Sequence, residues 1–225
     1  NDCSSLMLVT LPHPMEMIGK KAFNKCNSLV KVCTPQSLKN STQNTESCEE
    51  HEITEKSTNN ICTFGNYSFR GCSLLKEITI PSSVTKIGKN AFGACLSLTE
   101  ISIPSTVTTI EKNVFQRCKK LKKITIPSSI TEIKENAFSN CSSLTEITIP
   151  SSVAVIGTGC FSYCSSLKQI AILTSIVSIG AGVFGYCSSL TQFVIPSSIT
   201  TIVPYMFIGC SSLKEITIPS SVTKI

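Results

Sequence analysis

Several residue types that enzymes rely on are scarce in this chain of 225 residues. Trp is absent, Asp2 is the sole aspartate, and His13 and His51 are the two histidines. General acid–base catalysis and metal binding draw mainly on His, Asp, Glu and Cys. Because two of these types are nearly missing, the composition argues against an enzyme. We also expect no bound metal and no other cofactor.

Charge is sparse as well, since charged residues make up 15% of the sequence where about a quarter is usual. The apolar fraction of 41% is enough for a packed core. The chain contains no Gly-rich phosphate loop, no Cys-x-x-Cys pair and no histidine beside a candidate nucleophile. Cys160 and Cys164 stand four residues apart, but no histidine supports a metal site, so we interpret them as core residues.

Cysteine, by contrast, is common and regularly spaced. Of 13 cysteines, most recur at an interval of 23 residues, and an odd total excludes complete pairing within the chain. Self-similarity at a fixed period of this length is typical of a solenoid. The column continues back from Cys72 to Cys26 and Cys3, and forward through Cys95, Cys118, Cys141, Cys164, Cys187 and Cys210.

One unit indicates how the repeat folds. After Cys95, the segment L-T-E-I-S-I alternates polar and apolar residues and ends at Pro104, which predicts a short strand. Val107 and Ile110 predict a second extended piece that runs back. Residues 113–115, Asn-Val-Phe, predict a single helical or 3₁₀ turn. One such unit cannot bury a core alone, but stacked units form a continuous core and a parallel sheet.

The repeated pattern L-x-x-I-x-I-P-S-S-V-T-x-I-G-x-x-A-F-x-x-C-S-S resembles the BspA-like, or treponemal-type, class of leucine-rich repeat. The match is close from Cys72 to Ile225 and recognisable from Cys3 to Pro35. The resemblance implies a curved solenoid that binds proteins, and characterised relatives are often surface adhesins with extracellular-matrix ligands. We therefore predict an α/β fold over residues 1–225: one leucine-rich-repeat solenoid with a parallel concave β-sheet, short second strands and single helical or 3₁₀ turns.

Residues 36–60 do not follow the repeat, because polar residues occupy its apolar positions. The phase returns at Phe64 and Cys72, which correspond to Ile110 and Cys118. Either a whole repeat has decayed in place, or one repeat carries an insertion. Burying so many polar groups without partners would be costly, which favours a polar insertion loop. We interpret its acidic charge as that of a solvated loop, with an acidic appendage for a partner as the alternative.

Both ends lack the polar cap that a solenoid needs for solubility. The chain opens at Asn1, just before a repeat cysteine, and closes at Ile225 within a unit. We expect a fragment of a longer array, or ends that stack on something, including end-to-end self-association. Neither an initiator Met nor a signal peptide is visible, so the N-terminus does not indicate whether the protein is exported.

The column cysteines predict buried, reduced thiols, because each takes the place of a small apolar residue. A disulfide ladder is the alternative, since neighbouring column cysteines would lie about one strand spacing apart. A Cys33–Cys62 disulfide at the base of the polar stretch is the less favoured outcome for two cysteines outside the column. Three sequons would accept glycans only in an exported protein: Asn40, Asn66 and Asn140.

A basic cluster surrounds one predicted strand, with Lys112 nearby. It could bind a polyanion such as a sulfated glycan or an acidic protein, and the alternative is solvated charge that keeps the solenoid soluble. We expect no nucleic acid, because no aromatic platform accompanies the lysines. The cluster consists of Arg117, Lys119, Lys120, Lys122 and Lys123.

Residues 169–213 contain no charged residue. Within this run, the outward column of the predicted strands turns apolar. Tyr163, which lies just before the run, and Tyr186 occupy equivalent sites and should stack. Charge depletion combined with tyrosines is typical of an interface, whereas an ordinary solenoid that happens to lack charge is the alternative. The candidates for protein binding are Tyr163, Tyr186, Tyr205, Val155, Val177, Ala171 and Val194.

Two functions remain open. The first is a surface adhesion or host-interaction module, secreted or on the cell surface, whose partner is an extracellular-matrix or host surface protein. The second is a cytoplasmic protein–protein scaffold or regulator, which the predicted reduced thiols favour.

Overall fold

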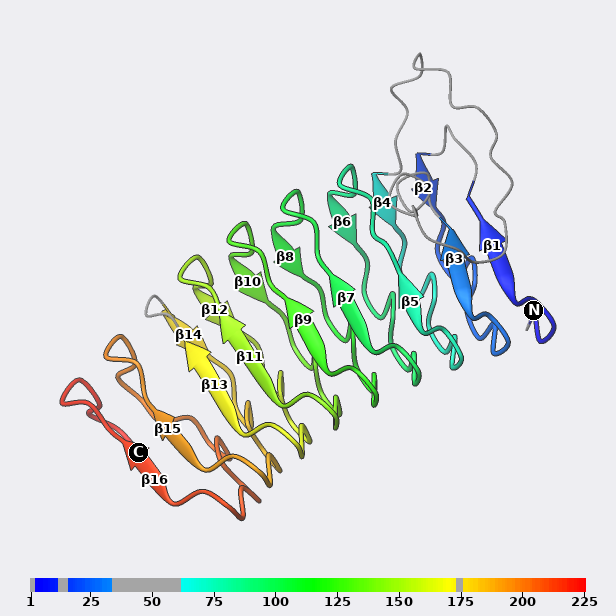
Figure 1. The fold of residues 1–225 in the computed structure, drawn as a ribbon. Coiled ribbons are helices and arrows are strands. Elements are labelled where there is room, and N and C mark those ends of the chain that lie inside the picture. The colour runs from blue at the N-terminus through cyan, green and yellow to red at the C-terminus, as the bar shows by residue number, and fades with distance from the viewer. Residues whose placement is uncertain (1–2, 12–15, 34–61, 173–175) are drawn as a thin grey trace, which may run out of the picture.

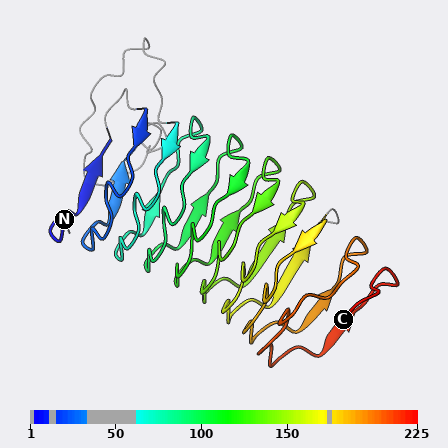
Figure 2. The ribbon, with the colours of Figure 1, turned by 180° about the vertical axis from the view of Figure 1, so that it is seen from behind.

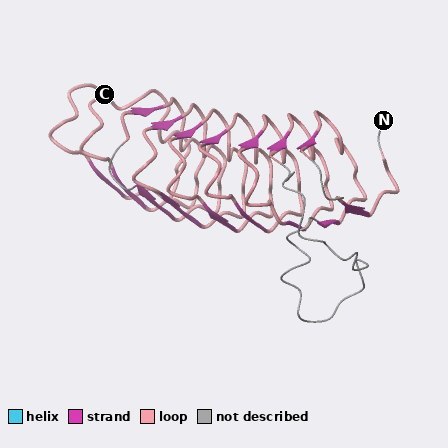
Figure 3. Ribbon diagram, turned by 90° about the horizontal axis from the view of Figure 1, so that it is seen from above, coloured by secondary structure: helices cyan, strands magenta, loops and turns pink. Residues whose placement is uncertain are grey.

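The structure is a computed structural model that describes residues 3–11, 16–33, 62–172 and 176–225. These residues form an elongated parallel β-solenoid with the two termini at opposite ends (Figure 1, Figure 2). Each repeat contributes a strand to a first row, a strand to a second row and a turn segment. Seen from above, the two strand rows lie on opposite sides of the solenoid (Figure 3).

The first strand row is built from parallel, in-register neighbours. Glu100 pairs with Lys123 and Ser102 with Thr125, as the 23-residue period requires. Apolar residues at alternate positions face inward, so the three successive residues of β7, and likewise of β9, are exposed, buried and exposed. The row consists of β1 (Leu8–Thr10), β3 (Lys31–Cys33), β5 (Glu77–Ile78), β7 (Glu100–Ser102), β9 (Lys123–Thr125), β11 (Glu146–Ile149), β13 (Gln169–Ile172), β15 (Gln192–Val194) and β16 (Glu215–Thr217).

The second strand row consists of two-residue strands whose second residue is buried. Its members also pair in parallel, as Glu132 does with Thr109 and with Val155, and a bridge between Thr201 and Lys224 continues the row. The strands are β2 (Met17–Ile18), β4 (Thr63–Phe64), β6 (Lys86–Ile87), β8 (Thr109–Ile110), β10 (Glu132–Ile133), β12 (Val155–Ile156) and β14 (Ser178–Ile179). The predicted short second strands are thus confirmed.

The predicted helical or 3₁₀ turns are wrong, because no residue in the described part of the chain is helical. In residues 113–117 the φ angles of Asn113 and Arg117 are 59° and 63°, and left-handed residues interrupt a right-handed helix. The N–H groups of Asn113, Phe115 and Arg117 instead donate to carbonyls of the next repeat. These turns therefore form a third ladder along the solenoid, which we call the turn row.

Every turn has two left-handed positions four residues apart. They are Lys21 and Lys25, Tyr67 and Gly71, Asn90 and Ala94, Asn113 and Arg117, Asn136 and Asn140, Gly159 and Tyr163, Gly182 and Tyr186, and Tyr205 and Gly209.

Stacked phenylalanines run through the core beneath the turn row. Neighbouring rings are 5.3–6.0 Å apart between centroids and nearly parallel. The periodicity predicts these side chains as core, but not that they stack. This Phe column consists of Phe23, Phe69, Phe92, Phe115, Phe138, Phe161, Phe184 and Phe207.

The column cysteines from Cys72 to Cys187 lie beside the Phe column as buried thiols without disulfides, as predicted, whereas Cys210 is partly buried and Cys3 is exposed. The Cys118 thiol donates to the Phe92 carbonyl oxygen at 3.2 Å, and Cys141 donates to that of Phe115 in the same way. Burial raises the pKa of the Cys118 thiol from the ordinary value of 9.0 to about 12. At neutral pH the sulfur therefore keeps its proton and remains a donor.

The strands on either side of residues 34–61 pair directly. Lys31 of β3 lies opposite Glu77 of β5, and Met17 of β2 lies opposite Thr63 of β4. The predicted insertion at 36–60 itself lies outside the described residues and stays a prediction, as does a Cys33–Cys62 disulfide.

Candidate binding surface

The outward side of the first strand row carries two grooves, and we call it the grooved face. Its side chains come from alternate strand positions, so residues of one type form columns across neighbouring strands. The predicted columns are confirmed where strands pair, for example Thr148 opposite Ala171 and Val194 opposite Thr217.

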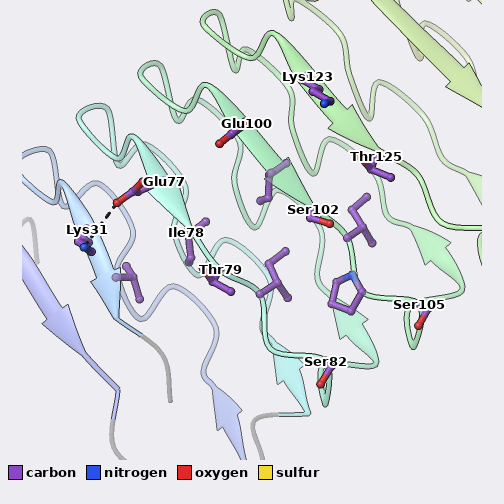
Figure 4. A pocket seen from close by; sticks show the side chains of 15 residues that line it. Lys31, Glu77, Ile78, Thr79, Ser82, Glu100, Ser102, Ser105, Lys123 and Thr125 are labelled. Carbon is purple, nitrogen blue, oxygen red and sulfur yellow. Dashed lines mark ion pairs between the residues drawn. The ribbon is translucent and has the colours of Figure 1, made fainter. Parts of the chain in front are cut away.

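The N-terminal groove, of about 870 Å³, carries charged and hydroxyl side chains beside apolar ones (Figure 4). Lys31 and Glu77 form an ion pair at 3.7 Å on its wall. Glu100 and Lys123 stand on neighbouring strands in register, and hydroxyl groups such as that of Thr79 line the floor between the strands. Exposed ion pairs contribute little binding energy, so this groove offers solvated, alternating charge.

The C-terminal groove, of about 1210 Å³, differs in chemistry. Lys122, Lys123 and Glu146 lie at one end, and the remaining lining residues, from β13 onward, carry no charge. The structure brings Ala171 and Val194 together here, and the Val194 side chain is 67% exposed. The groove is thus a shallow surface of amide, hydroxyl and small apolar groups.

Sequence reasoning missed Gln169 and Gln192 as members of this site. They precede Ala171 and Val194 by two residues and line the same groove. The two-residue strand period could have identified them, because residues i and i+2 of a strand share a face.

The structure does not bring all seven protein-binding candidates together. Val155, in β12, is partly buried, and Val177, just before β14, is 77% exposed. The N–H of Val177 donates to Ala154 O at 2.8 Å. Both valines therefore lie in the second strand row, on the side away from the grooved face (Figure 3).

The tyrosine candidates lie on a third surface, the turn row. Tyr163 and Tyr186 stack with ring centroids 4.6 Å apart and an interplanar angle of 6°, as predicted. Their side chains are 50% and 44% exposed. Tyr205 occupies the other left-handed position of its turn, four residues before Gly209, and is 69% exposed.

The basic cluster is exposed at all five positions. Lys112, which lies nearby in sequence, is not part of it, because its Nζ pairs with Glu135 at 2.5 Å. A second ion pair, between Glu111 and Lys134 at 2.9 Å, crosses the first between the same two repeats. Among the described residues, the cluster's own side chains form no ion pair.

Over residues 3–11, 16–33, 62–172 and 176–225, no three His, Cys, Asp or Glu side chains gather in a group that could hold a metal ion. Within the same ranges, no helix is long and apolar enough to cross a membrane.

Comparison with known proteins agrees with this geometry. A family model described as the BspA type leucine-rich repeat region, with six repeat copies, matches residues 1–122 and 108–225. A leucine-rich repeat protein of T. pallidum is 33% identical, with a TM-score of 0.63 over 69% of this chain and 73% of its own. A leucine-rich cell surface protein from Faecalibacterium prausnitzii A2-165 is 26% identical, with a TM-score of 0.58 over 98% of this chain and 83% of its own.

A pneumococcal vaccine antigen shares the fold at 18% identity, with a TM-score of 0.54 over 97% of this chain and 62% of its own. No curated protein matches the chain.

Proposed function

Because the chain belongs to the BspA-type leucine-rich repeat family, we propose that it is a non-catalytic module that binds a protein partner through the C-terminal groove. The observation that carries this proposal is the loss of charge there. From β13 onward the lining consists of groups such as Gln169, Ala171, Gln192 and Val194. Charged residues are depleted at the centre of protein interfaces, where their desolvation would be costly.

The expected affinity of a single site is modest. Interface hot spots favour Trp, Tyr and Arg, and the aromatic residue of this groove, Phe193, is 3% exposed and serves the core. A weak site still holds firmly when many copies act together on a surface. This combination suits adhesion better than tight one-to-one binding.

We propose that the chain acts on the cell surface or as a secreted protein, with an extracellular-matrix or host surface protein as its partner. A similar protein from Faecalibacterium prausnitzii is described as a cell surface protein, which supports this location. Column thiols such as Cys118 and Cys164 are compatible with an oxidising compartment, because they are buried and their pKa values are raised by that burial.

The second candidate is an intracellular scaffold that uses the same groove. The reduced state of buried column thiols such as Cys118 and Cys141 favours it, since cytosolic proteins keep cysteine reduced. Glycosylation of Asn66 in the native protein would show that the protein is exported. Asn66 is exposed, and its Oδ1 accepts the Lys89 N–H at 2.8 Å. Mass spectrometry of native material that finds Asn66 glycosylated would contradict the intracellular scaffold.

The test is surface plasmon resonance of the chain against a panel of purified extracellular-matrix proteins. We expect a Val194→Lys variant to bind its matrix partner at least about tenfold more weakly, because an unpaired charge would be buried in the interface. Val177→Lys is the matched control, since this valine is similarly exposed but lies in the second strand row. Unchanged binding by Val194→Lys, or a larger loss in Val177→Lys, would contradict the proposal.

A further inference from the structure

Arg117, Lys119 and Lys120 of the basic cluster lie at or beside the turn row, on the same edge of the solenoid as the tyrosine pair. Arg117, Asn140, Tyr163 and Tyr186 hold the same left-handed position in successive repeats, followed by Gly209. The backbone joins them, because Arg117 N–H donates to Ser139 O at 2.8 Å and Asn140 N–H to Ser162 O at 2.7 Å. We call these five residues the edge column.

The backbone of the edge column does not require large side chains. The φ angles of Arg117, Tyr163 and Tyr186 lie between 60° and 63°, a conformation that is unfavourable for a residue with a Cβ. Gly209 and Gly71 hold the same position without that cost, and Asn tolerates it well. Arg and Tyr thus stand at positions where the backbone favours Gly or Asn, and their exposed side chains are available to a ligand.

The tyrosine pair offers a single free ring face. One face of Tyr186 stacks on Tyr163, and the other lies on Gly209, where an added Cβ would come within 2.5 Å of the Tyr186 Cδ1 atom. The free face is that of Tyr163 on the Asn140 side. Successive nucleobases each need an aromatic face, so the pair does not form a platform for single-stranded nucleic acid, whereas one sugar ring fits against it.

Positive charge stands two repeats from that free face. Arg117 is separated from Tyr163 by the Asn140 repeat, or roughly 9–10 Å at the usual strand spacing. Lys119 and Lys120 extend the charge, and both are exposed. The intervening repeat presents hydrogen-bonding groups alone, the Asn140 amide and the hydroxyls of residues 142 and 143.

We propose that the edge column, together with Lys119 and Lys120, binds a sulfated polysaccharide that runs along the solenoid axis. Its sulfate groups contact Arg117, Lys119 and Lys120, its hydroxyl groups contact the Asn140 repeat, and one sugar ring packs on Tyr163. Clustered Lys and Arg are the usual electrostatic footprint of a heparin-binding surface. This site is separate from the C-terminal groove and does not depend on the proposed protein partner.

The test is heparin affinity, measured by surface plasmon resonance at fixed ionic strength. Lys119→Ser with Lys120→Ser introduces the residues that the next repeat carries, and we expect about tenfold weaker binding from two lost ion pairs. Lys76→Thr with Lys214→Thr is the matched control, because both lysines are exposed and lie about two or more repeats away from Arg117, Lys119 and Lys120. It removes the same charge, and we expect less than about a twofold change.

A second variant tests the ring. Tyr163→Asn with Tyr186→Asn keeps a residue suited to positive φ and leaves the net charge unchanged. We expect about fivefold weaker heparin binding from the lost ring contact, with an unchanged circular dichroism spectrum.

Three results would overturn the proposal. The first is an equal loss of heparin affinity in the Lys76 and Lys214 control, which would show that net charge alone determines binding. The second is undiminished heparin binding by the folded tyrosine variant. The third is tighter binding to oligodeoxythymidylate or to polyglutamate than to heparin of similar charge, which would assign the surface to nucleic acid or to an acidic peptide.

Discussion

At the residue scale, the turn row selects residues by the backbone conformation that they tolerate. Asn90, Asn113 and Asn136 hold left-handed positions, and Asn is among the few residues with a Cβ that adopt this conformation readily. The sequence motif Asn-x-Phe by itself predicts a helical turn, and Lys21, Tyr67 and Tyr205 at the equivalent positions hide the preference for Asn and Gly. Comparison of all repeats for Asn and Gly at positions four apart could have predicted the left-handed turns.

Close approach of neighbouring repeats makes one glycine column sensitive to size. A Cβ at Gly180 would lie 2.2 Å from the Thr158 backbone nitrogen, whereas one at Gly19 would meet nothing within 4 Å. We expect Gly180→Ala to lower the free energy of unfolding by about 1–3 kcal/mol, the usual cost of overpacking, as measured by urea denaturation.

Gly19→Ala is the control and should change the free energy of unfolding by less than about 0.5 kcal/mol. Equal effects of the two substitutions would show that the repeats do not pack as closely as described.

The buried thiols predict loss of stability at alkaline pH. Burial raises the pKa of Cys72, Cys118 and Cys164 from 9.0 to about 12, so above pH 9 the unfolded chain releases protons that the folded chain retains. Stability is therefore complete below pH 9 and declines as pH rises toward 12. In this window, each thiol lowers the free energy of unfolding by on the order of 1 kcal/mol per pH unit. Urea denaturation at pH 8 and pH 10 measures the summed loss.

Cys118→Ser provides the control for this pH dependence. A serine hydroxyl can donate to Phe92 O as the thiol does, but it does not titrate in this range. The decline between pH 8 and pH 10 should be smaller in the variant by roughly one thiol's share. An identical pH profile would mean that Cys118 does not drive the alkaline loss.

At the element scale, the strands were predictable and the turns were not. β7 and β9 follow a two-residue alternation that ends at a proline, and this pattern predicts a strand from local sequence alone. The turn row depends on hydrogen bonds between repeats, such as Phe92 N–H to Val114 O at 3.0 Å. No local pattern reports a bond between residues in different repeats, so the turn's own sequence predicts a helical turn that the structure does not contain.

The Phe column predicts that replacing a phenylalanine by alanine lowers the free energy of unfolding by an amount that depends on its place in the column. Phe138 stacks on both sides, at 5.5 Å and 5.4 Å from its neighbours, and is fully buried. Phe138→Ala should lower the free energy of unfolding by about 3–5 kcal/mol, as followed by chemical denaturation.

Phe23→Ala is the matched comparison, since Phe23 is partly buried and, among the described residues, stacks on Phe69 alone. Its cost should be clearly smaller. If the two substitutions cost the same, stacking between repeats does not determine the stability of the core.

At the scale of the whole molecule, residues that are close in sequence lie on different surfaces of the solenoid. Ala171, Val177 and Tyr163 lie within fifteen residues of one another, yet they belong to the grooved face, the second strand row and the turn row. The period predicts which residues share a column, and it correctly placed Ala171 with Val194. It does not predict which columns face the same way, because that depends on the path of the chain between strands.

The most direct test of the C-terminal groove as the protein-binding surface is site-specific photo-cross-linking to the bound matrix protein. Benzoylphenylalanine replaces Val194 in one variant and Val177 in another, and mass spectrometry quantifies the adducts. We expect strong cross-linking from position 194 and little from position 177, because the two positions lie on different sides of the solenoid. Strong cross-linking from position 177 with none from position 194 would contradict the account.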